Sequence, residues 1–271
     1  MNGASREALA AARERLDALT DNTSVDAARL AAELAAVTAL LDREVSLRRV
    51  LTDPAQSGEA KAELAHRLLG TQISGTAADL VAGLVRSRWS QSRDLVDALE
   101  QLADVADLTA AQRAGTLDDV EDELFRFGRI VTSNVELRAA LTDRKATASA
   151  KGELLRSLLG GRADAATERL VTRLVTAPRG RSLEAGLESL SKLAAARRDR
   201  MVAVVTSAVP LSDLQRQRLG AALAKLYGRT MHLNLDVDPE VLGGIRVQVG
   251  DEVINGSLAD RIEDAARRMA S

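Results

Sequence analysis

A stretch of 24 residues occurs twice in this chain, at a constant separation of 90 positions. Residues 47–70 read LRRVLTDPAQSGEAKAELAHRLLG, and residues 137–160 read LRAALTDRKATASAKGELLRSLLG. Twelve of the 24 aligned positions are identical, whereas chance in an Ala- and Leu-rich chain would give roughly 2 or 3. Solenoid repeats are shorter and more numerous, so two copies of about 90 residues predict two small globular modules.

The repeat extends beyond the matching stretch in both directions. Leu84 recurs as Leu174 at the same separation of 90, but Leu99 recurs as Leu187 at a separation of 88. The region around Trp89 therefore carries two more residues than its counterpart, a change that a loop can absorb. We infer that a whole module has been duplicated.

Helical periodicity dominates residues 4 to about 199. Leu95, Leu99 and Leu102 lie at i, i+4 and i+7, on one face of a helix, and the same spacing recurs 88 positions later. Segments rich in helix-breaking residues separate the predicted helices at 20–24, 52–57, 70–76, 88–92, 115, 142–147, 160–164 and 177–182. Each copy is thus expected to hold five or six short helices, with a helix near 92–112 closing the first copy and opening the second.

The last 70 residues change to the alternation of β-strands. Strands are predicted at 201–206, 230–237 and 245–249, and the turn at 250–252 predicts a hairpin into residues 253–254. The capping box Ser212-Asp-Leu-Gln215 opens a helix that Gly228 can end. We expect this helix to turn four side chains inward: Leu214, Leu219, Leu223 and Leu226. A second capping box, Ser257–Asp260, predicts a final helix with one apolar face formed by Leu258, Ile262, Ala265 and Met269.

These patterns predict an α+β multidomain protein. Its expected parts are a helical bundle at 1–105, a second helical bundle at 106–199 and a small α/β domain at 200–271. Aromatic residues are few, namely Trp89, Phe125, Phe127 and Tyr227. We therefore expect aliphatic helix-on-helix cores, and the helical spacing places both phenylalanines within such packing.

Composition argues against several classes of partner. The net charge is −2 with acids and bases interspersed, which does not favour a nucleic-acid partner. The densest basic cluster, formed by Arg197, Arg198 and Arg200, is expected to be a solvated helix end. The lack of Cys suits a reducing cytoplasm, and no secretory signal or membrane-spanning stretch is evident. Basic charge that is almost wholly Arg, together with abundant Ala, suggests a GC-rich genome.

No constellation of residues predicts an enzyme. His66 and His232 are the only histidines, and neither has an evident carboxylate or nucleophile partner in the sequence, so both are expected at the surface. The acidic residues are spread along helix faces at i, i+4 spacing to Arg, without a dense loop of oxygen ligands. We therefore expect no catalytic residue, no metal and no cofactor.

The pair Gly243-Gly244 invites comparison with a phosphate-binding loop. A Walker loop ends in Gly-Lys-Ser/Thr before a helix, whereas this pair follows Pro239 and enters a predicted strand. Its expected role is a tight turn with positive φ and close backbone approach. In the helical copies, surplus Leu and Val allow a groove for an amphipathic partner helix, although any one of these residues could equally belong to an internal core.

The C-terminal region carries a specific pattern of motifs. Residues 201–212 read MVAVVTSAVPLS, residues 237–251 read VDPEVLGGIRVQVGD, and residues 253–262 read VINGSLADRI. In order and spacing these segments resemble the delta subunit family of F-type ATP synthases, which includes the mitochondrial oligomycin-sensitivity-conferring protein. The helical copies also resemble the six-helix domain of that family. The second copy is extra, and Asn255 stands where the family usually has Asp.

The resemblance implies a non-catalytic stator subunit in the peripheral stalk, on the cytoplasmic face of a bacterial cell membrane that it meets only through the complex. It implies two partners, the N-terminal helices of the alpha subunits and the b subunits. The C-terminal turn region is the candidate surface for the b subunits: Pro239, Leu242, Gly243, Gly244, Gly256 and Ser257. One helical copy would bind an alpha-subunit helix, and the other would extend the stalk or take a further contact. The alternative is a free-standing helical-repeat adaptor unrelated to ATP synthase.

Overall fold

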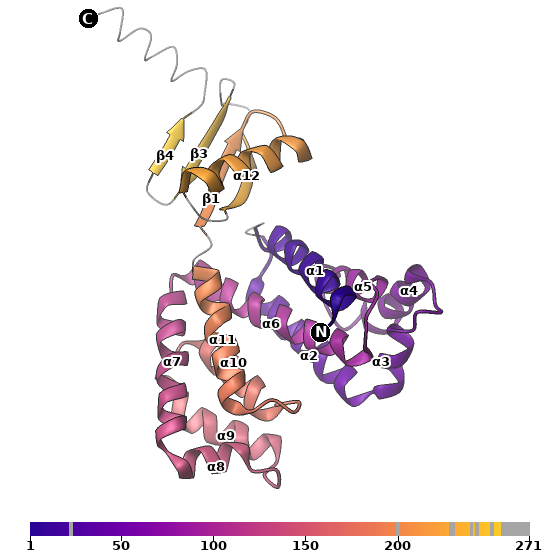
Figure 1. Ribbon diagram of the computed structural model, residues 1–271, viewed down its shortest axis with the longest axis vertical. Coiled ribbons are helices and arrows are strands. Elements are labelled where there is room, and N and C mark those ends of the chain that lie inside the picture. The colour runs from indigo at the N-terminus through magenta and orange to yellow at the C-terminus, as the bar shows by residue number, and fades with distance from the viewer. Residues whose placement is uncertain are drawn as a thin grey trace, which may run out of the picture. The chain divides into compact units, whose positions relative to one another are not determined.

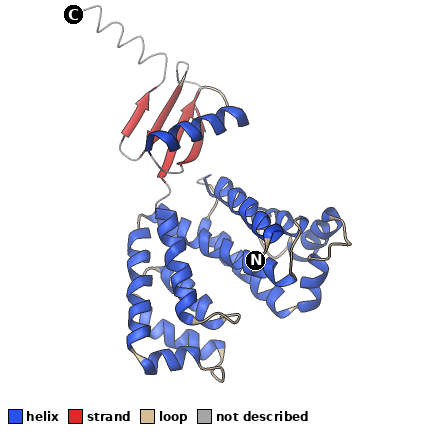
Figure 2. Cartoon of the chain, in the orientation of Figure 1, coloured by secondary structure: helices blue, strands red, loops and turns tan. Residues whose placement is uncertain are grey.

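The computed structural model describes residues 1–21, 24–198, 201–227, 231–238, 241, 244–249 and 252–255. Contacts divide the chain into two units, Met1–Arg197 and Arg198–Ser271. Within the described residues, the first unit is built from helices, and strands occur in the second (Figure 2). The predicted change from helical to strand periodicity at Met201 is confirmed.

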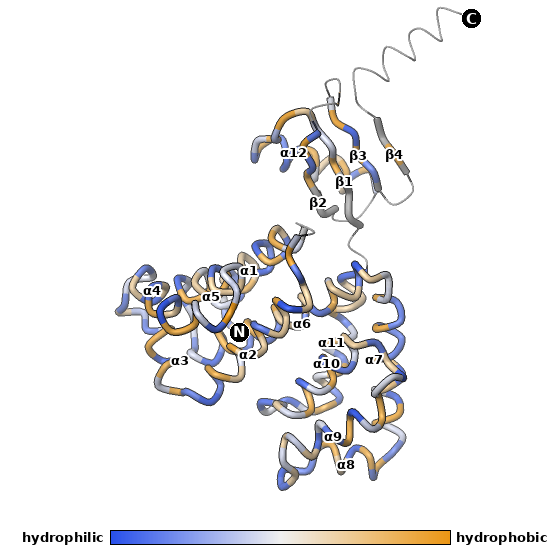
Figure 3. The backbone as a smooth tube through the Cα atoms, turned by 180° about the vertical axis from the view of Figure 1, so that it is seen from behind, coloured by the Kyte–Doolittle hydropathy of each residue, from blue (hydrophilic) through white to orange (hydrophobic). Residues whose placement is uncertain are grey.

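The described part of the first unit contains eleven helices (Figure 1). They are α1 (Gly3–Asp21), α2 (Ala27–Arg43), α3 (Val45–Leu51), α4 (Gly58–Leu69), α5 (Gly75–Arg86), α6 (Ser92–Ala114), α7 (Leu117–Ser133), α8 (Val135–Thr142), α9 (Ala148–Leu159), α10 (Ala165–Thr176) and α11 (Leu183–Arg198). The bounds of α2 to α5 recur 90 positions later in α7 to α10, apart from one residue at the end of α8. Hydrophilic and hydrophobic residues are interspersed along these helices, as expected for amphipathic helices that pack on one another (Figure 3).

The duplicated sequence makes equivalent contacts in both copies. Glu33 on α2 accepts a hydrogen bond of 2.5 Å from the hydroxyl of Ser74, the residue that caps α5. Ninety positions on, Glu123 on α7 accepts one of 3.0 Å from the backbone N–H of Asp164, which caps α10. In each copy, therefore, a carboxylate of the second helix holds the start of the fifth helix, where unpaired N–H groups favour negative charge.

Helix α6 belongs to both copies. It runs for 23 residues, 14 of which are buried. Its residues from Leu95 to Ala106 join the apolar core of the first copy, while Leu108 and Ala111 join that of the second. The predicted shared helix near 92–112 is confirmed. The predicted division at 105/106 falls inside α6, and residues 1–197 form one compact unit, so an arrangement of two separate bundles is not confirmed.

The first and last helices of this unit are joined by a buried ion pair. Nη1 of Arg197 on α11 lies 2.7 Å from Oδ1 of Asp17 on α1, and its Nε donates to Gln112 at 2.6 Å. Arg197 is only 9% exposed. The expectation of a solvated helix end is therefore wrong for Arg197, because its guanidinium finds a carboxylate 180 positions earlier that no local pattern could reveal.

The second unit is a small α/β fold. Its described elements are β1 (Met201–Ser207), α12 (Asp213–Tyr227), β2 (Met231–Val237), β3 (Ile245–Val249) and β4 (Glu252–Asn255). The strand order is β2-β1-β3-β4, in which β1 and β2 are parallel and the other pairs are antiparallel. The predicted strands are confirmed, and the hairpin is confirmed by the pairing of Val249 with Glu252.

Helix α12 begins as predicted but turns a narrower face inward. The capping box is present, because Ser212 N–H donates to Gln215 Oε1 at 2.9 Å and the Ser212 hydroxyl accepts from Gln215 N–H. Leu223 is buried, but Leu214 and Leu226 are 57% and 66% exposed. The inward orientation expected for those two leucines is wrong, since the small sheet meets a single stripe of α12. Gly228, expected to end the helix, and the predicted final helix after Ser257 lie outside the described residues.

Candidate docking surfaces

A groove of about 450 Å³ lies between α7 and α11. Apolar atoms of Leu124, Phe125 and Leu187 line it, and Gly128 leaves space in its floor. Charged side chains also line it, with Arg129 on α7 and two glutamates, Glu184 and Glu188, on α11. An apolar lining flanked by an arginine on one side and glutamates on the other is a surface that an amphipathic helix can fill.

Phe125 is the main departure of this groove from the sequence-based expectation. It is 58% exposed, whereas Phe127 is 5% exposed, so the expectation of core packing holds for Phe127 and is wrong for Phe125. The spacing of the two phenylalanines carries the signal. Residues two positions apart on an α-helix point about 200° apart around its axis, so they cannot share one buried face. Phe125 also stands 90 positions after Ala35, where the first copy has a small residue.

The equivalent helices of the first copy are closely packed. There α2 and α6, the counterparts of α7 and α11, pack directly on each other along their length. Leu34 and Leu99, like their counterparts Leu124 and Leu187, are at most 4% exposed, so the copies differ in how closely these helices approach and not in the burial of these leucines. Ala103 stands where the second copy has Ser191, and this small residue allows close helix approach. In the second copy the equivalent helices, α7 and α11, line the groove described above.

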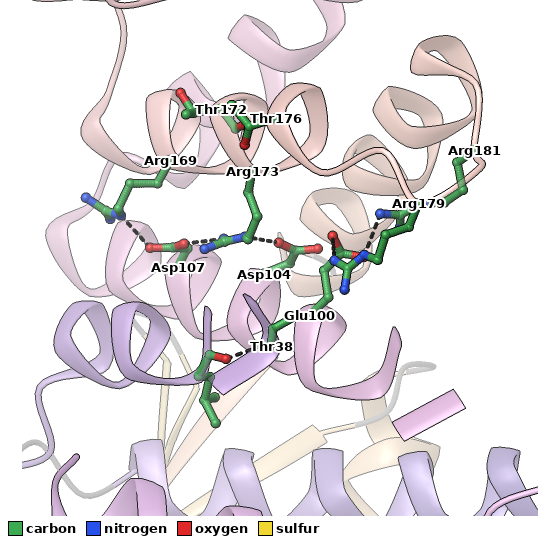
Figure 4. Close-up of polar contacts among 11 residues, drawn as sticks. Thr38, Glu100, Asp104, Asp107, Arg169, Thr172, Arg173, Thr176, Arg179 and Arg181 are labelled. Atoms are coloured by element: carbon green, nitrogen blue, oxygen red, sulfur yellow. Dashed lines mark hydrogen bonds and ion pairs between the residues drawn. The ribbon is translucent and has the colours of Figure 1, made fainter. Parts of the chain in front are cut away.

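A row of buried carboxylates lies along α6 and faces arginines of the second copy (Figure 4). Arg173 on α10 reaches Asp104 at 3.0 Å and Asp107 at 2.5 Å, and Arg169 reaches Asp107 at 2.6 Å. Glu100 pairs with Arg181 at 2.6 Å and also with Arg179. This ionic cluster fastens α6 to α10 and to the segment before α11.

The expectation that acidic residues pair with Arg at i, i+4 along a helix face is wrong for this cluster, because its arginines lie on α10 and on the segment before α11. Burial raises the pKa of Asp104 to about 7, and the nearby carboxylates of Glu100 and Asp107 act in the same direction, against the lowering effect of Arg173. The i, i+4, i+7 spacing of these acids matches one helical face, as does the i, i+4 spacing of Arg169 and Arg173. That match was the available signal, but nothing in the sequence shows that the two faces meet.

The predicted turn residues are only partly described. Gly244 has φ of +91°, in the region that favours glycine, as the tight-turn prediction requires. Pro239, Leu242, Gly243, Gly256 and Ser257 lie outside the described residues.

The sequence predicts both histidines at the surface without an evident acidic partner. His66 is partly exposed as expected, but its Nε2 lies 3.6 Å from Asp79, so the expectation that it lacks a carboxylate partner is wrong. The side chain of His232 is not described. Among the described residues there is no group of three or more His, Cys, Asp or Glu placed to hold a metal ion. No helix in the described ranges is long and apolar enough to cross a bilayer.

Comparison with known proteins places the chain in a class of helical, non-catalytic stator components. The sequence profile of the ATP synthase delta (OSCP) subunit matches residues 105–269. The chain belongs to the ATP synthase delta (OSCP) subunit family. It is a structural subunit of the peripheral stalk, and the alternative of a free-standing adaptor is not supported.

Similar proteins extend over the whole chain. An ATP synthase subunit delta of Streptomyces coelicolor is 85% identical over 271 residues, which is all of this chain and 99% of that protein. One from Streptomyces avermitilis is 83% identical over 270 residues, with 100% and 99% covered. One from Thermobifida fusca is 50% identical over 270 residues, with both chains fully covered. The duplicated helical region therefore lies within the length that these relatives share.

A chain in the cryo-EM structure of the Toxoplasma gondii mitochondrial ATP synthase hexamer is 20% identical, with a TM-score of 0.28, and the match covers 62% of this chain and 97% of that one. At that TM-score the likeness supports no conclusion about this chain.

The family profile begins at residue 105, inside α6, and so spans the second helical copy and the C-terminal unit. The first copy precedes the matched part.

Proposed function

We propose that this subunit links the catalytic head of ATP synthase to the membrane-anchored b subunits, at the cytoplasmic face of the bacterial cell membrane. In this role it keeps the head from turning with the rotor during proton-driven ATP synthesis. The second helical copy takes an N-terminal helix of an alpha subunit, and the C-terminal unit takes the b subunits. The observation that supports the head contact is the groove between α7 and α11, which lies in the part that the family profile matches.

The chemistry of the groove suits an amphipathic helix. Phe125 supplies a large apolar anchor, and such residues dominate the energetics of interfaces. Arg129 and the glutamates on α11 offer opposite charges to the two flanks of an incoming helix, which sets its orientation. A slow dissociation rate is what a stator needs, and filled apolar anchors mainly lower that rate.

The alpha-subunit contact is tested by titrating the full-length chain with a peptide of the alpha-subunit N-terminal segment, using calorimetry. Phe125→Asp should weaken binding at this groove at least about tenfold, because it replaces the apolar anchor with a charge. Ile130→Asp is the matched control, since Ile130 is also exposed on α7, at 52%, but does not line the groove. Equal affinities of both variants and wild type, with intact circular dichroism, would refute this assignment.

The b-subunit contact is assigned to the C-terminal unit and its turn region. The unit exposes several apolar side chains, among them Val209, Leu214 and Leu226. The proposed surface also includes the turn residues: Pro239, Leu242, Gly243, Gly244, Gly256 and Ser257. Gly244→Val should abolish b-subunit binding, because Val cannot readily adopt φ of +91° at the entry to β3.

The control for the b-subunit test is Gly220→Ala on α12. A Cβ at Gly220 would meet only Leu233 Cδ1, at the ordinary distance of 3.8 Å. Pull-down of a tagged b-subunit soluble segment by each variant measures the effect. Retention of both folding and b-subunit affinity in Gly244→Val would contradict the role given to this turn.

A further inference from the structure

We propose that Arg197 is a mechanical anchor, which holds the end of α11 to α1 and α6 so that force arriving through the C-terminal unit passes into both helical copies. The presence of such a force rests on the proposed stator function. The two units meet along the chain between Arg197 and Arg198. Force that travels along the chain from one unit to the other therefore enters the helical unit at the end of α11.

The last turn of α11 contributes little apolar contact. Ala194, which is 0% exposed, is the last residue of this helix in the apolar core of the second copy. Ala195 is partly buried and Ala196 is exposed, whereas Arg197 is buried again. Helix ends fray readily, so the attachment of this turn depends mainly on Arg197.

The side chain of Arg197 joins three helices at one point. Its Nη1 donates to Oδ1 of Asp17 on α1 at 2.7 Å, and its Nε donates to Oε1 of Gln112 on α6 at 2.6 Å. Hydrogen bonds between charged groups are short and roughly twice as strong as neutral ones. Because α1 belongs to the first copy and α6 to both, the last helix of the second copy is fastened to the first.

The helix that receives this anchor is itself tied to α6. Arg113 of α6 donates through Nη1 to the backbone carbonyl of Val25 at 2.5 Å, and through Nη2 to that of Thr20 in the last turn of α1. Force passed from Arg197 to Asp17 thus reaches a second polar attachment between α1 and α6. The two attachments act in series along the same end of α1.

The equivalent helix of the first copy is held in a different way. Arg197 stands 88 positions after Thr109, which lies within α6. Helix α6 runs on to Ala114, and its residues Leu108 and Ala111 join the apolar core of the second copy. The duplicated helix is therefore held by apolar packing where the chain continues into another helical copy. It is held by a polar anchor where the chain continues into the C-terminal unit.

A polar anchor resists force differently from an apolar contact. A hydrogen bond weakens steeply outside a narrow range of distance and angle, whereas apolar contact is lost gradually with the area that is uncovered. Forced unfolding is governed by the unfolding rate and not by the equilibrium free energy. The Arg197 contacts should therefore slow rupture under force more than an apolar replacement of equal stability would.

The test is single-molecule force spectroscopy on the full-length chain. The chain has no Cys, so handles can be attached to introduced cysteines alone. Glu63→Cys with Arg218→Cys applies force through the end of α11, whereas Glu63→Cys with Arg144→Cys applies it within the helical unit. All three side chains are exposed.

The variant to compare with wild type is Asp17→Leu with Arg197→Met, because replacing both members of a buried pair is often nearly neutral for equilibrium stability. With force applied through α11, it should rupture at least about tenfold faster than wild type at the same force. With force applied within the helical unit, the two rates should agree within about twofold. Leu190→Met is the matched control, a volume-conserving change at a buried position of α11, and it should behave as wild type in both geometries.

A second variant covers the case in which the double variant does not fold. Arg197→Lys keeps the charge but has one nitrogen in place of the planar fork, so it cannot reproduce both hydrogen bonds. It should also rupture faster than wild type, by at least about threefold, when force is applied through α11.

Wild-type rupture rates in both variants under force through α11 would overturn the anchor. Equal acceleration in both pulling geometries would also overturn it, because Arg197 would then contribute only to general stability. These rates are measured on the isolated chain, so they are independent of the calorimetric and pull-down tests of the proposed function.

Discussion

Asp104 lies on α6 between two other carboxylates, Glu100 and Asp107, with the guanidinium of Arg173 at 3.0 Å. A buried acid in such a row is stabilised in its neutral form by desolvation and by its acidic neighbours. The protonation state of Asp104 therefore affects the contact between α6 and α10. The pH of the surroundings then affects the stability of this contact.

Stability should fall as the pH rises towards 7 because of this group. The pKa of Asp104 is raised to about 7 in the folded chain, against about 3.9 when unfolded. Between these two pKa values the folded chain holds a proton that the unfolded chain releases. The stability that this proton contributes is fully present below the unfolded pKa, and it is lost as the pH rises through the folded pKa. The slope from this group is at most about 1.4 kcal/mol per pH unit.

Asp104→Asn removes the titrating group and keeps its size. Urea denaturation of both chains at pH 5, 6, 7 and 8 measures the difference. The variant should gain stability relative to wild type as the pH increases up to about 7, and the difference should level off above it. Parallel stability curves would show that Asp104 does not titrate in this window.

Gly152 within α9 and Gly160 at its end allow the effect of backbone crowding to be distinguished from that of helix propensity. A Cβ at Gly160 would lie 2.5 Å from the carbonyl oxygen of Arg156, whereas one at Gly152 would meet nothing within 4 Å. Gly160→Ala should therefore destabilise by roughly 1–3 kcal/mol, and Gly152→Ala should stabilise by about 0.5–1 kcal/mol. The midpoint of urea unfolding measures both, and shifts in the same direction would contradict this account.

At the scale of elements, a buried ion pair connects α1 and α11. Asp17 and Arg197 have side chains that are 3% and 10% exposed, so neither charge can turn to solvent if its partner is lost. Removing one member of a buried pair leaves an uncompensated charge, whereas replacing both by apolar residues is often nearly neutral. The Asp17–Arg197 pair therefore favours the contact between the first and the last helix of this unit.

Arg197→Met should lower the free energy of unfolding by about 3–5 kcal/mol. The double variant Asp17→Leu with Arg197→Met should recover most of that loss. Thermal and urea unfolding of the three chains measures the effect. A single-variant loss below about 0.5 kcal/mol would indicate a solvated pair of little energetic weight.

At the scale of the whole molecule, α6 makes the helical unit indivisible. A fragment of residues 92–198 retains every helix of the second copy but loses α2, which packs along α6. Leu95, Leu99 and Leu102 are 0% exposed in the intact chain. Uncovering each would cost about 1.5–3 kcal/mol, so we expect the helical copies, which form one compact unit, to depend on the shared helix α6.

Fragments 1–114 and 92–198 should therefore behave differently in sedimentation. The first keeps α6 together with α1 to α5, and it should be monomeric and unfold cooperatively. The second exposes the leucines of α6, and it should self-associate at micromolar concentration. If the second fragment is a monomer as stable as the first, α6 is not a shared core element.

Much of the fold can be predicted from local patterns, because the spacing of apolar residues differs between helices and strands. The 90-residue separation predicts the bounds of α7 to α10 from those of α2 to α5, and the Ser212 capping box marks the start of α12. The C-terminal motifs point to the family that the comparisons establish. The exposure of Phe125 also had a local signal, in its spacing from Phe127.

The sequence by itself determined that this protein has a duplicated helical module, a small α/β unit and no evident catalytic machinery. Only the tertiary structure decided that α6 serves both copies, that Arg197 meets Asp17, and that the copies differ in which helix pairs close. The physical reason is range. Periodicity and capping act within a few residues, whereas the buried ion pairs join side chains 62 to 180 positions apart. Two copies of one sequence pattern can therefore pack differently.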